Sequence, residues 1–291
     1  ALVISDIVGA PLAAIASGPT VPDPTSYDDA RTAVIRHLPY RRLPLRVQRH
    51  LDAGAAGELE ETPSRLPRSV FTTAIGHGDR ALAAMQKEAR ARDWRVFNLG
   101  ARFEGDTAAL AAFHAALTRS VLRAGSPRRA PLCLISGGET TVRLCSRPGR
   151  GGRNQEFALG FARSLALSQD LDRVTVLAGG SDGEDGPTDA AGALLDVAAW
   201  KRLEGGSDAA GAALATNDAY PLLHDLRALV KPGPTGTNVM DLRVVLISYG
   251  LPKSPWEREI ARRSAVDGLQ GTAYCPDGRF QARRNAWWRD P

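Results

Sequence analysis

Cysteines, aromatic residues and long apolar runs are all scarce in this 291-residue sequence. The three cysteines, Cys133, Cys145 and Cys275, lie far apart with no CxxC spacing, which argues against a disulfide framework and a cysteine-based zinc site. The five histidines are scattered, and no His, Cys and carboxylate residues cluster at metal-ligand spacing. No apolar run approaches the roughly 20 residues that cross a bilayer. We therefore expect a cytosolic protein without a membrane partner.

The composition is that of a soluble globular chain, with 43% hydrophobic and 24% charged residues. Its length suits one large domain or two ordinary ones. The net charge is +5, but residues 251–291 hold eight Lys/Arg against five Asp/Glu and the rest is nearly neutral. Because the basic excess lies largely in one tail, we do not expect a nucleic-acid partner.

The first half of the chain predicts alternating strands and helices. Residues 1–6 predict a buried strand, so the chain starts inside an element and we expect a preceding segment to be absent. Residues 28–53 predict helix interrupted by Pro39 and Pro44. The pattern then becomes regular, with strands at about 70–75, 95–99 and 131–135 and helices beginning near residues 78 and 105. This βαβαβ order favours a parallel sheet covered by helices.

The second half has glycine-rich loops between short elements. We expect a helix at 154–168, a strand at about 173–178, Ala-rich helices to about 228 and a closing strand at 242–248. The predicted domains are residues 1–128, residues 129–249 and an unassigned tail, 250–291, which holds three of the five Trp.

The tripeptide Gly-Pro-Thr occurs three times, at residues 18–20, 186–188 and 233–235. A rigid turn of this kind can direct backbone N–H groups and a Thr hydroxyl at an anion such as phosphate. Three ordinary turns are the alternative, and for any single copy that alternative is favoured.

Two segments of the second half predict an anion site. Gly137–Thr141 (GGETT) follows a predicted strand, where open α/β sheets place their ligands. Residues 147–156 (RPGRGGRNQE) lead into a predicted helix, whose N-terminus and arginines favour carboxylate or phosphate. A flexible basic loop capped by Asn154 is the alternative.

The segment Gly179–Asp189 packs Asp182, Glu184, Asp185 and Asp189 among glycines directly after a strand. Carboxylates in such a loop can bind Mg²⁺ or act as a general base. A solvated acidic turn remains an alternative. Residues 217–218 and 235–241 add polar groups that, alone, would be caps or turns.

A rival signal is Gly76–Ala81, which fits the GxGxxA dinucleotide fingerprint between a strand and a helix. The following strand ends in Asn98-Leu99, where an acidic residue should receive the ribose hydroxyls, so an NAD site is incomplete. Arg102 could meet a 2′-phosphate instead.

Together these segments resemble the class II glycerate kinases, a two-domain family whose C-terminal half is called the MOFRL domain. The resemblance covers roughly residues 1–248, and the order and number of the matching segments make it specific. They are residues 3–9, 15–20, 136–141, 149–156, 181–192, 217–218, 233–238 and Asp241.

The resemblance implies an α/β protein, with a partial Rossmann-like three-layer domain followed by a MOFRL-type domain. It implies ATP- and Mg²⁺-dependent phosphorylation of D-glycerate, usually to 2-phosphoglycerate, in a cleft between the domains. Carried over by position, Arg153, Asp182 and Asp189 are the expected catalytic residues, with Asp182 and Asp189 as Mg²⁺ ligands. The expected substrate- and nucleotide-binding residues are Asp6, Ser17, Gly18, Thr20, Gly137, Gly138, Glu139, Asn154, Asp185, Thr188, Asn217, Thr237, Asn238 and Asp241.

Two alternatives to a competent kinase stay open. Some members of this family are labelled hydroxypyruvate reductases, and Gly76–Ala81 would support their NAD(P) site. The chain could instead be an inactive kinase fragment, because the family takes a catalytic Lys from a segment that would precede residue 1. The sequence leaves the oligomeric state open, a homodimer included.

Overall fold

The computed structural model describes residues 1–165, 171–203 and 207–248, and its chain forms two compact units. The first unit is Ala1–Ile75 and the second starts at Gly76. The boundary predicted near residue 128 differs from this division, because strand β3 (Arg95–Asn98) pairs with strand β5 (Leu132–Thr141) inside the second unit. The predicted tail, 250–291, lies outside the described residues.

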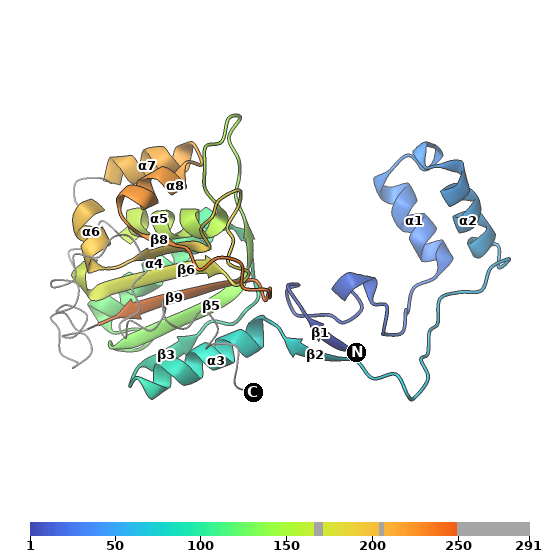
Figure 1. Cartoon of the computed structure of the whole chain (residues 1–291), viewed down its shortest axis with the longest axis horizontal. Helices are drawn as coiled ribbons and strands as arrows, with labels where there is room; N and C mark the ends of the chain where they lie inside the picture. Colours follow the sequence, from blue (N-terminus) through green and yellow to red (C-terminus); the bar gives the residue numbers. More distant parts are fainter. Residues whose placement is uncertain (166–170, 204–206, 249–291) are drawn as a thin grey trace. The chain divides into compact units, whose positions relative to one another are not determined.

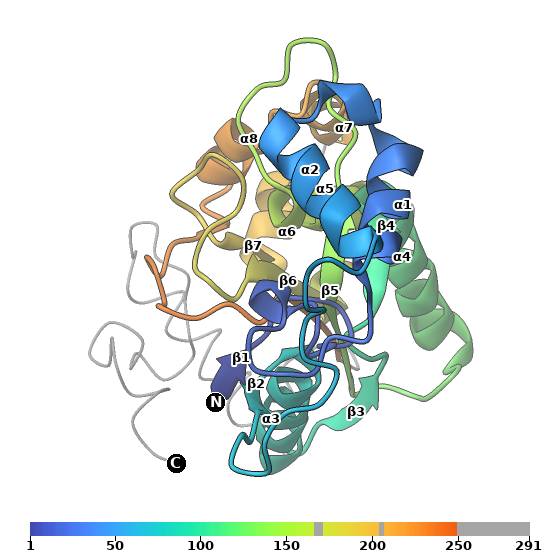
Figure 2. The ribbon, with the colours of Figure 1, turned by 90° about the vertical axis from the view of Figure 1, so that its right-hand side faces the viewer.

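The first unit is built on two short helices, α1 (Tyr27–His37) and α2 (Leu45–Ala55), which lie side by side (Figures 1 and 2). Helix α1 starts at a capping box between Ser26 and Asp29, and α2 starts directly after Pro44. Two 3-10 turns, η1 (Ile15–Ser17) and η2 (Tyr40–Arg42), occupy the connections. The predicted proline interruption of the helical segment is thus confirmed.

The first unit also holds a two-stranded sheet of β1 (Leu2–Ile4) and β2 (Thr73–Gly76). The prediction of a buried first strand is wrong, since Leu2 is 70% and Ile4 46% exposed. A sheet of two strands has little area with which to bury its own side chains.

The second unit is centred on a seven-stranded sheet of order β3-β5-β9-β6-β7-β8, with β4 (Phe103–Asp106) also paired to β5 (Figure 1). The remaining strands are β6 (Val174–Gly180), β7 (Gly192–Leu195), β8 (Leu229–Val230) and β9 (Asp241–Ile247). Strands β3 and β4 run parallel to β5, whereas β9 is antiparallel to both β5 and β6. The parallel pairing predicted from the βαβαβ run is confirmed for β3 and β5, whereas β2, the first strand of that run, lies in a separate sheet. The order of elements does not fix the direction of β9, which enters between β5 and β6 after a long connection.

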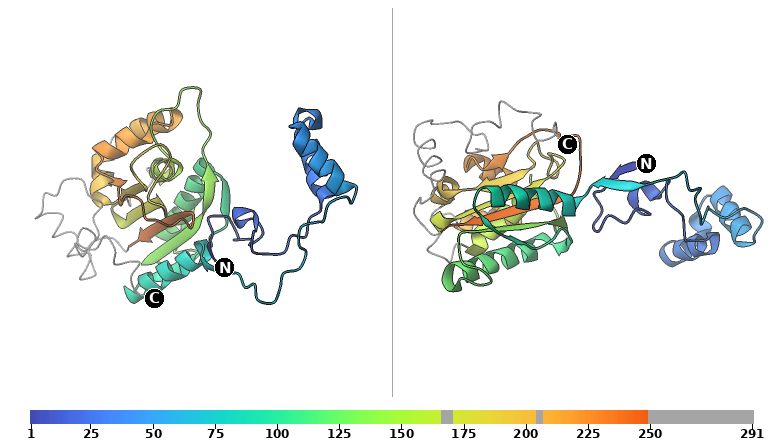
Figure 3. Two further views of the ribbon diagram at one scale, coloured as in Figure 1. Left: turned by 45° about the vertical axis from the view of Figure 1, so that its right-hand side comes forward. Right: turned by 90° about the horizontal axis from the view of Figure 1, so that it is seen from below.

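Helices cover both faces of this sheet, and the fold is α/β. Helix α3 (Gly78–Ala91) packs on one face, and α4 (Thr107–Ala124) and α5 (Arg153–Leu165) pack on the other (Figure 3). Helices α6 (Val197–Leu203), α7 (Ser207–Ala215) and α8 (Ala219–Asp225) complete the unit, with a 3-10 turn, η3 (Leu171–Arg173), before β6. None of the described helices is long and apolar enough to cross a membrane.

Strand register brings three loops of the second unit to one edge of the sheet. Asp241, at the start of β9, pairs with Gly138 of β5 on one side and with Gly180 of β6 on the other. The loops that follow β5 and β6 and the loop that precedes β9 therefore meet at this edge. Strand β5 runs on to Thr141, so the GGETT segment lies within the strand rather than after it.

Candidate functional site

The N-terminus of α5 is capped by a carboxylate from the acidic loop. Asp185 accepts the backbone N–H groups of Asn154 at 3.0 Å and Gln155 at 2.9 Å, and its side chain is buried. Burial raises the pKa of Asp185 to about 6, although these two N–H groups act to lower it. We predicted this helix N-terminus as part of a site for an external anion, but two of its backbone N–H groups are engaged by the protein's own carboxylate.

Two glycines allow the loops at this edge to touch. Gly183 and Gly186 have φ values of +92° and +60°, which side chains rarely adopt. A Cβ at Gly183 would lie 2.1 Å from the carbonyl oxygen of Gly233, and one at Gly186 would lie 2.3 Å from that of Gly151. Glycine is therefore required where the acidic loop contacts its two neighbours.

A cluster of charged residues forms around Asp241, whose side chain is fully buried. Arg153 Nε donates to Asp241 Oδ2 at 2.8 Å, and Arg243 Nη2 donates to the same oxygen at 3.1 Å. Asn154 Nδ2 donates to Asp241 Oδ1 at 2.8 Å, and Arg153 Nη1 donates to Glu139 Oε1 at 2.9 Å. We call these five residues, Glu139, Arg153, Asn154, Asp241 and Arg243, the Asp241 cluster.

Arg153 is the cation of this cluster that can meet an anionic ligand, because 34% of its side chain is exposed and that of Arg243 is buried. Burial acts to lower its pKa, but the charges and hydrogen bonds of Asp241 and Glu139 outweigh burial and raise it. Its hydrogen bonds to these two residues use Nε and Nη1. Among the described residues, Nη2 donates no hydrogen bond, so that side of the guanidinium is available to an anion.

The acidic residue Asp189 belongs to a second, more exposed group. Tyr220 Oη donates to Asp189 Oδ1 at 2.7 Å, and Lys231 Nζ donates to Asp189 Oδ2 at 3.1 Å. The guanidinium of Arg150 lies 4.4 Å from the centre of the Tyr220 ring. We call Arg150, Asp189, Tyr220 and Lys231 the Asp189 cluster. The hydrogen bonds of Tyr220 and then Lys231 hold the pKa of Asp189 below its usual value.

The predicted metal ligands Asp182 and Asp189 make separate contacts in the part of the chain that the structure describes. Asp182 Oδ1 accepts the backbone N–H of Glu184 at 3.1 Å, as in a local turn. No group of three or more His, Cys, Asp or Glu side chains suited to a metal ion occurs among the described residues. Within the same residues, no hydrogen bond or ion pair joins Asp182 or Asp189 to Arg153. A joint role of Asp182 and Asp189 with Arg153 therefore stays a prediction.

Other predicted site residues hold the loops in shape. Asn217 is nearly buried and accepts the backbone N–H of Cys145 at 2.8 Å, while its amide donates to Glu156 at 2.8 Å. Asn238 Oδ1 accepts the backbone N–H of Met240 at 2.9 Å, and the carbonyl oxygen of Thr237 accepts the Thr235 hydroxyl.

The Thr residues of the three Gly-Pro-Thr turns are hydrogen-bonded within the protein, as ordinary turns would be. Thr188 Oγ1 donates to the carbonyl oxygen of Asp185 at 2.8 Å, and Thr235 Oγ1 donates to that of Ser181 at 2.6 Å. Thr20 accepts the Thr72 hydroxyl at 3.0 Å.

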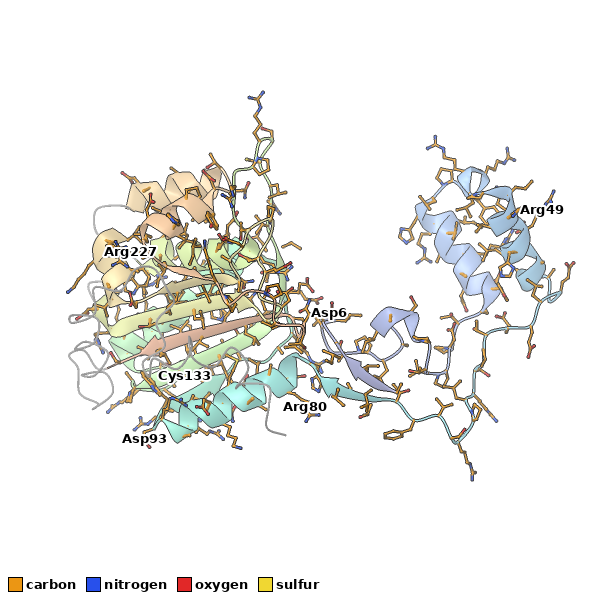
Figure 4. All side chains as sticks on the ribbon, in the orientation of Figure 1. Asp6, Arg49, Arg80, Asp93, Cys133 and Arg227 are labelled. Carbon is orange, nitrogen blue, oxygen red and sulfur yellow. The ribbon has the colours of Figure 1, made fainter. Side chains whose placement is uncertain are left out.

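The predicted site residues Asp6, Ser17, Gly18 and Thr20 belong to the first unit. Asp6, labelled in Figure 4, comes two residues after β1, and Ser17 ends η1 with φ at +63°. Their participation in a site stays a prediction.

Sequence reasoning missed Arg243, Lys231, Tyr220 and Gln155. Arg243 carried a signal: in the strand Asp241–Ile247, alternate positions are buried, and an Asp and an Arg occupy two of them. A charged pair on the buried face of a strand indicates a built polar contact rather than a surface one.

Comparison with known proteins identifies the family. Residues 132–241 match the model of the MOFRL family, and residues 1–52 match a domain of unknown function, DUF4147. A glycerate kinase of Macaca fascicularis is 33% identical to this chain, with 84% of the chain and 71% of that protein covered. The chain belongs to the glycerate kinase family.

Other members of the glycerate kinase family are matched over less of their length. A glycerate 2-kinase of Pyrococcus horikoshii is 34% identical over 85% of the chain, and the chain spans 55% of it. The crystal structure of the Thermotoga maritima glycerate kinase is similar with a TM-score of 0.74 and 33% identity, covering 84% of this chain and 56% of that one. Two relatives from Agrobacterium vitis carry another name, "Putative hydroxypyruvate reductase".

Proposed function

We propose that this chain transfers a phosphoryl group from ATP to D-glycerate and yields 2-phosphoglycerate. Membership of the glycerate kinase family supports the reaction class. The observation that carries the proposal is Arg153, which is held by Asp241 and Glu139 and has its Nη2 side available to an anion.

The chemistry suits such an arginine. Phosphoryl transfer requires positioning and charge neutralisation more than covalent chemistry, and both substrates are anions. The Nη2 of Arg153 carries two N–H donors and can donate to an oxygen of a carboxylate or phosphate. Because Asp241 fixes Nε, the guanidinium is oriented before a ligand arrives, which lowers the entropic cost of binding. We assign Arg153 to the glycerate carboxylate or to the transferred phosphoryl group.

Magnesium fits this site as a companion of ATP rather than as an ion held in a protein cage. Mg²⁺ in ATP-using enzymes takes one or two carboxylates together with phosphate oxygens and water. Asp182, which uses only Oδ1 in a hydrogen bond among the described residues, has the free oxygen that such a contact needs. Asp189 is the other candidate ligand and would exchange its contact with Lys231 or Tyr220. The ion would supply charge neutralisation on the phosphates.

The alternative, an NAD(P)-dependent hydroxypyruvate reductase, rests on the Gly76–Ala81 fingerprint and on the names of the Agrobacterium relatives. That fingerprint requires a βαβ unit whose two strands share a sheet. Here β2 and β3, on either side of α3, belong to different sheets. This difference favours the kinase.

The test is ADP release by the purified chain with Mg-ATP, in the presence and absence of D-glycerate. Glycerate-dependent release is expected, and ³¹P NMR of the product separates 2-phosphoglycerate from 3-phosphoglycerate. Absence of release would reject a competent kinase for this chain. Saturable NADPH binding without stabilisation by ATP against heat would instead support the reductase.

A further inference from the structure

Arg243 is the largest fully buried side chain in the described part of the molecule, at 1% exposure. It lies on β9, a central strand of the sheet, and shares its buried face with Asp241, Val245 and Ile247. Among the residues that the structure describes, its Nε and Nη1 atoms have no hydrogen-bond partner. A buried cation with unpaired N–H groups is costly. A core position in a strand would more cheaply hold an apolar residue, so Arg243 calls for an explanation other than packing.

The contacts of Arg243 connect it to the proposed site. Its Nη2 donates to Asp241 Oδ2 at 3.1 Å, the oxygen that also accepts Arg153 Nε at 2.8 Å. The same Nη2 lies 3.3 Å from Thr140 Oγ1, and the guanidinium lies 5.3 Å from the centre of the Phe157 ring. Two guanidinium groups, one buried and one partly exposed, thus share one carboxylate oxygen.

Because both guanidinium groups bind Asp241, Arg243 weakens the negative potential that Asp241 exerts at Arg153. In the Asp241 cluster, two guanidinium groups balance the carboxylates of Glu139 and Asp241. Without the charge of Arg243, the cluster would carry one net negative charge. The full charge of Asp241 would then act on Arg153 and repel an anionic ligand nearby.

We propose that Arg243 is a positioning residue that shares Asp241 with Arg153 and so keeps the Arg153 guanidinium fixed and available to an anion. The identity of that anion, glycerate or ATP, rests on the function proposed above. The electrostatic coupling of Arg153 and Arg243 is independent of that function.

The coupling is tested by ¹⁵N NMR of arginine side chains in the whole chain, with the Arg153 Nε–H resonance assigned from its loss in Arg153→Lys. We expect Arg243→Met to shift this resonance and Arg243→Lys, which keeps the charge, to shift it less. Val245→Ala removes a core group from the same face of the same strand and is the matched control. It should lower the melting temperature and leave the resonance in place.

Kinetics give the second readout. Arg243→Met should raise KM for the anionic substrates and lower kcat/KM at least about tenfold, and Arg243→Lys should recover most of the loss. An unchanged Arg153 resonance in Arg243→Met, or an equal shift in Val245→Ala, would overturn the proposal. If Arg243→Met does not fold, Arg243→Gln, which also removes the charge, takes its place in both readouts, and the same two outcomes would overturn the proposal. If the unmodified chain releases no ADP, the proposed function fails while the NMR result still decides the role of Arg243.

Discussion

The Asp241 and Asp189 clusters use similar residues in different surroundings. Each pairs a carboxylate with a cation beside the glycine-rich loops of the second unit. Asp241 has no exposed side-chain surface and accepts hydrogen bonds from three side chains. The side chain of Asp189 is 65% exposed, and that of its partner Lys231 is 36% exposed.

The difference shows what keeps an arginine side chain in one orientation, ready to bind an anion. A surface pair pays the entropy of holding two long side chains and is screened by water. A buried carboxylate whose oxygens are all engaged keeps its geometry without ligand. Asp241 and Asp189 both occur in the sequence motifs. Their burial distinguishes the preorganised Asp241 cluster from the exposed Asp189 cluster.

The largest effect on folding should come from removing Asp241. Asp241→Asn leaves the buried cation Arg243 without its partner and should lower the free energy of unfolding by about 3–5 kcal/mol. Asp189→Asn, in the exposed cluster, should cost less than about 1 kcal/mol. Urea unfolding of both variants measures the contrast. Equal losses would remove the distinction between the two clusters.

A second effect appears in the pH dependence of stability. The pKa of Asp185 rises from 3.8 to about 6 on folding, so its contribution to the free energy of unfolding is lost as pH rises through this range. Burial lowers the pKa of His114, whose Nε2 lies 2.9 Å from Ser136 Oγ, from 6.5 to about 4. Its contribution therefore grows as pH rises from about 4 to 6.5. Each amounts to roughly 3 kcal/mol at most, with opposite sign, so in the unmodified chain they largely cancel.

Single substitutions should separate the contributions of Asp185 and His114 to the pH dependence of stability. Relative to the unmodified chain, Asp185→Asn should gain stability as pH rises from 4 to 6.5, and His114→Gln should lose stability over the same range. Urea unfolding at pH 4.5 and 6.5 measures both differences. Parallel pH profiles for the three proteins would contradict these pKa directions.

The smallest effect concerns the exposed cluster. Tyr220→Phe removes the hydroxyl that bonds Asp189 and Lys231 and keeps the ring beneath Arg150. We expect a change below about 1 kcal/mol in unfolding free energy. The pKa of Asp189 should rise toward its usual value, and a carboxyl ¹³C NMR titration measures it. A larger loss of stability would show that this cluster, too, acts as a structural centre.

Much of the fold follows from the sequence, because helix caps, prolines and apolar periodicity act locally. The breaks at Pro39 and Pro44, the helix that begins near residue 105 and the start of α5 are examples. The antiparallel course of β9 could not be predicted, since strand direction after a long connection depends on pairing with residues far away in the sequence.

The sequence predicted which residues belong to the candidate site but not which of them contact one another. Glycine-rich segments with polar side chains indicated Arg153, Asn154, Asp185 and Asp241. In the structure these four residues are joined by hydrogen bonds. The role of Asp185 as a helix cap requires the closeness of the Gly186 turn to Gly151, which no local pattern encodes.

The most direct test of the account is glycerate-dependent ADP release by Arg153→Ala compared with Arg31→Ala and the unmodified chain. Arg31 is a matched control because it forms an exposed ion pair with Asp52 on the first unit. The account predicts a loss of roughly 10²–10³-fold in Arg153→Ala, typical of removing a preorganised donor to developing charge, and little change in Arg31→Ala. Equal losses in the two variants would contradict it.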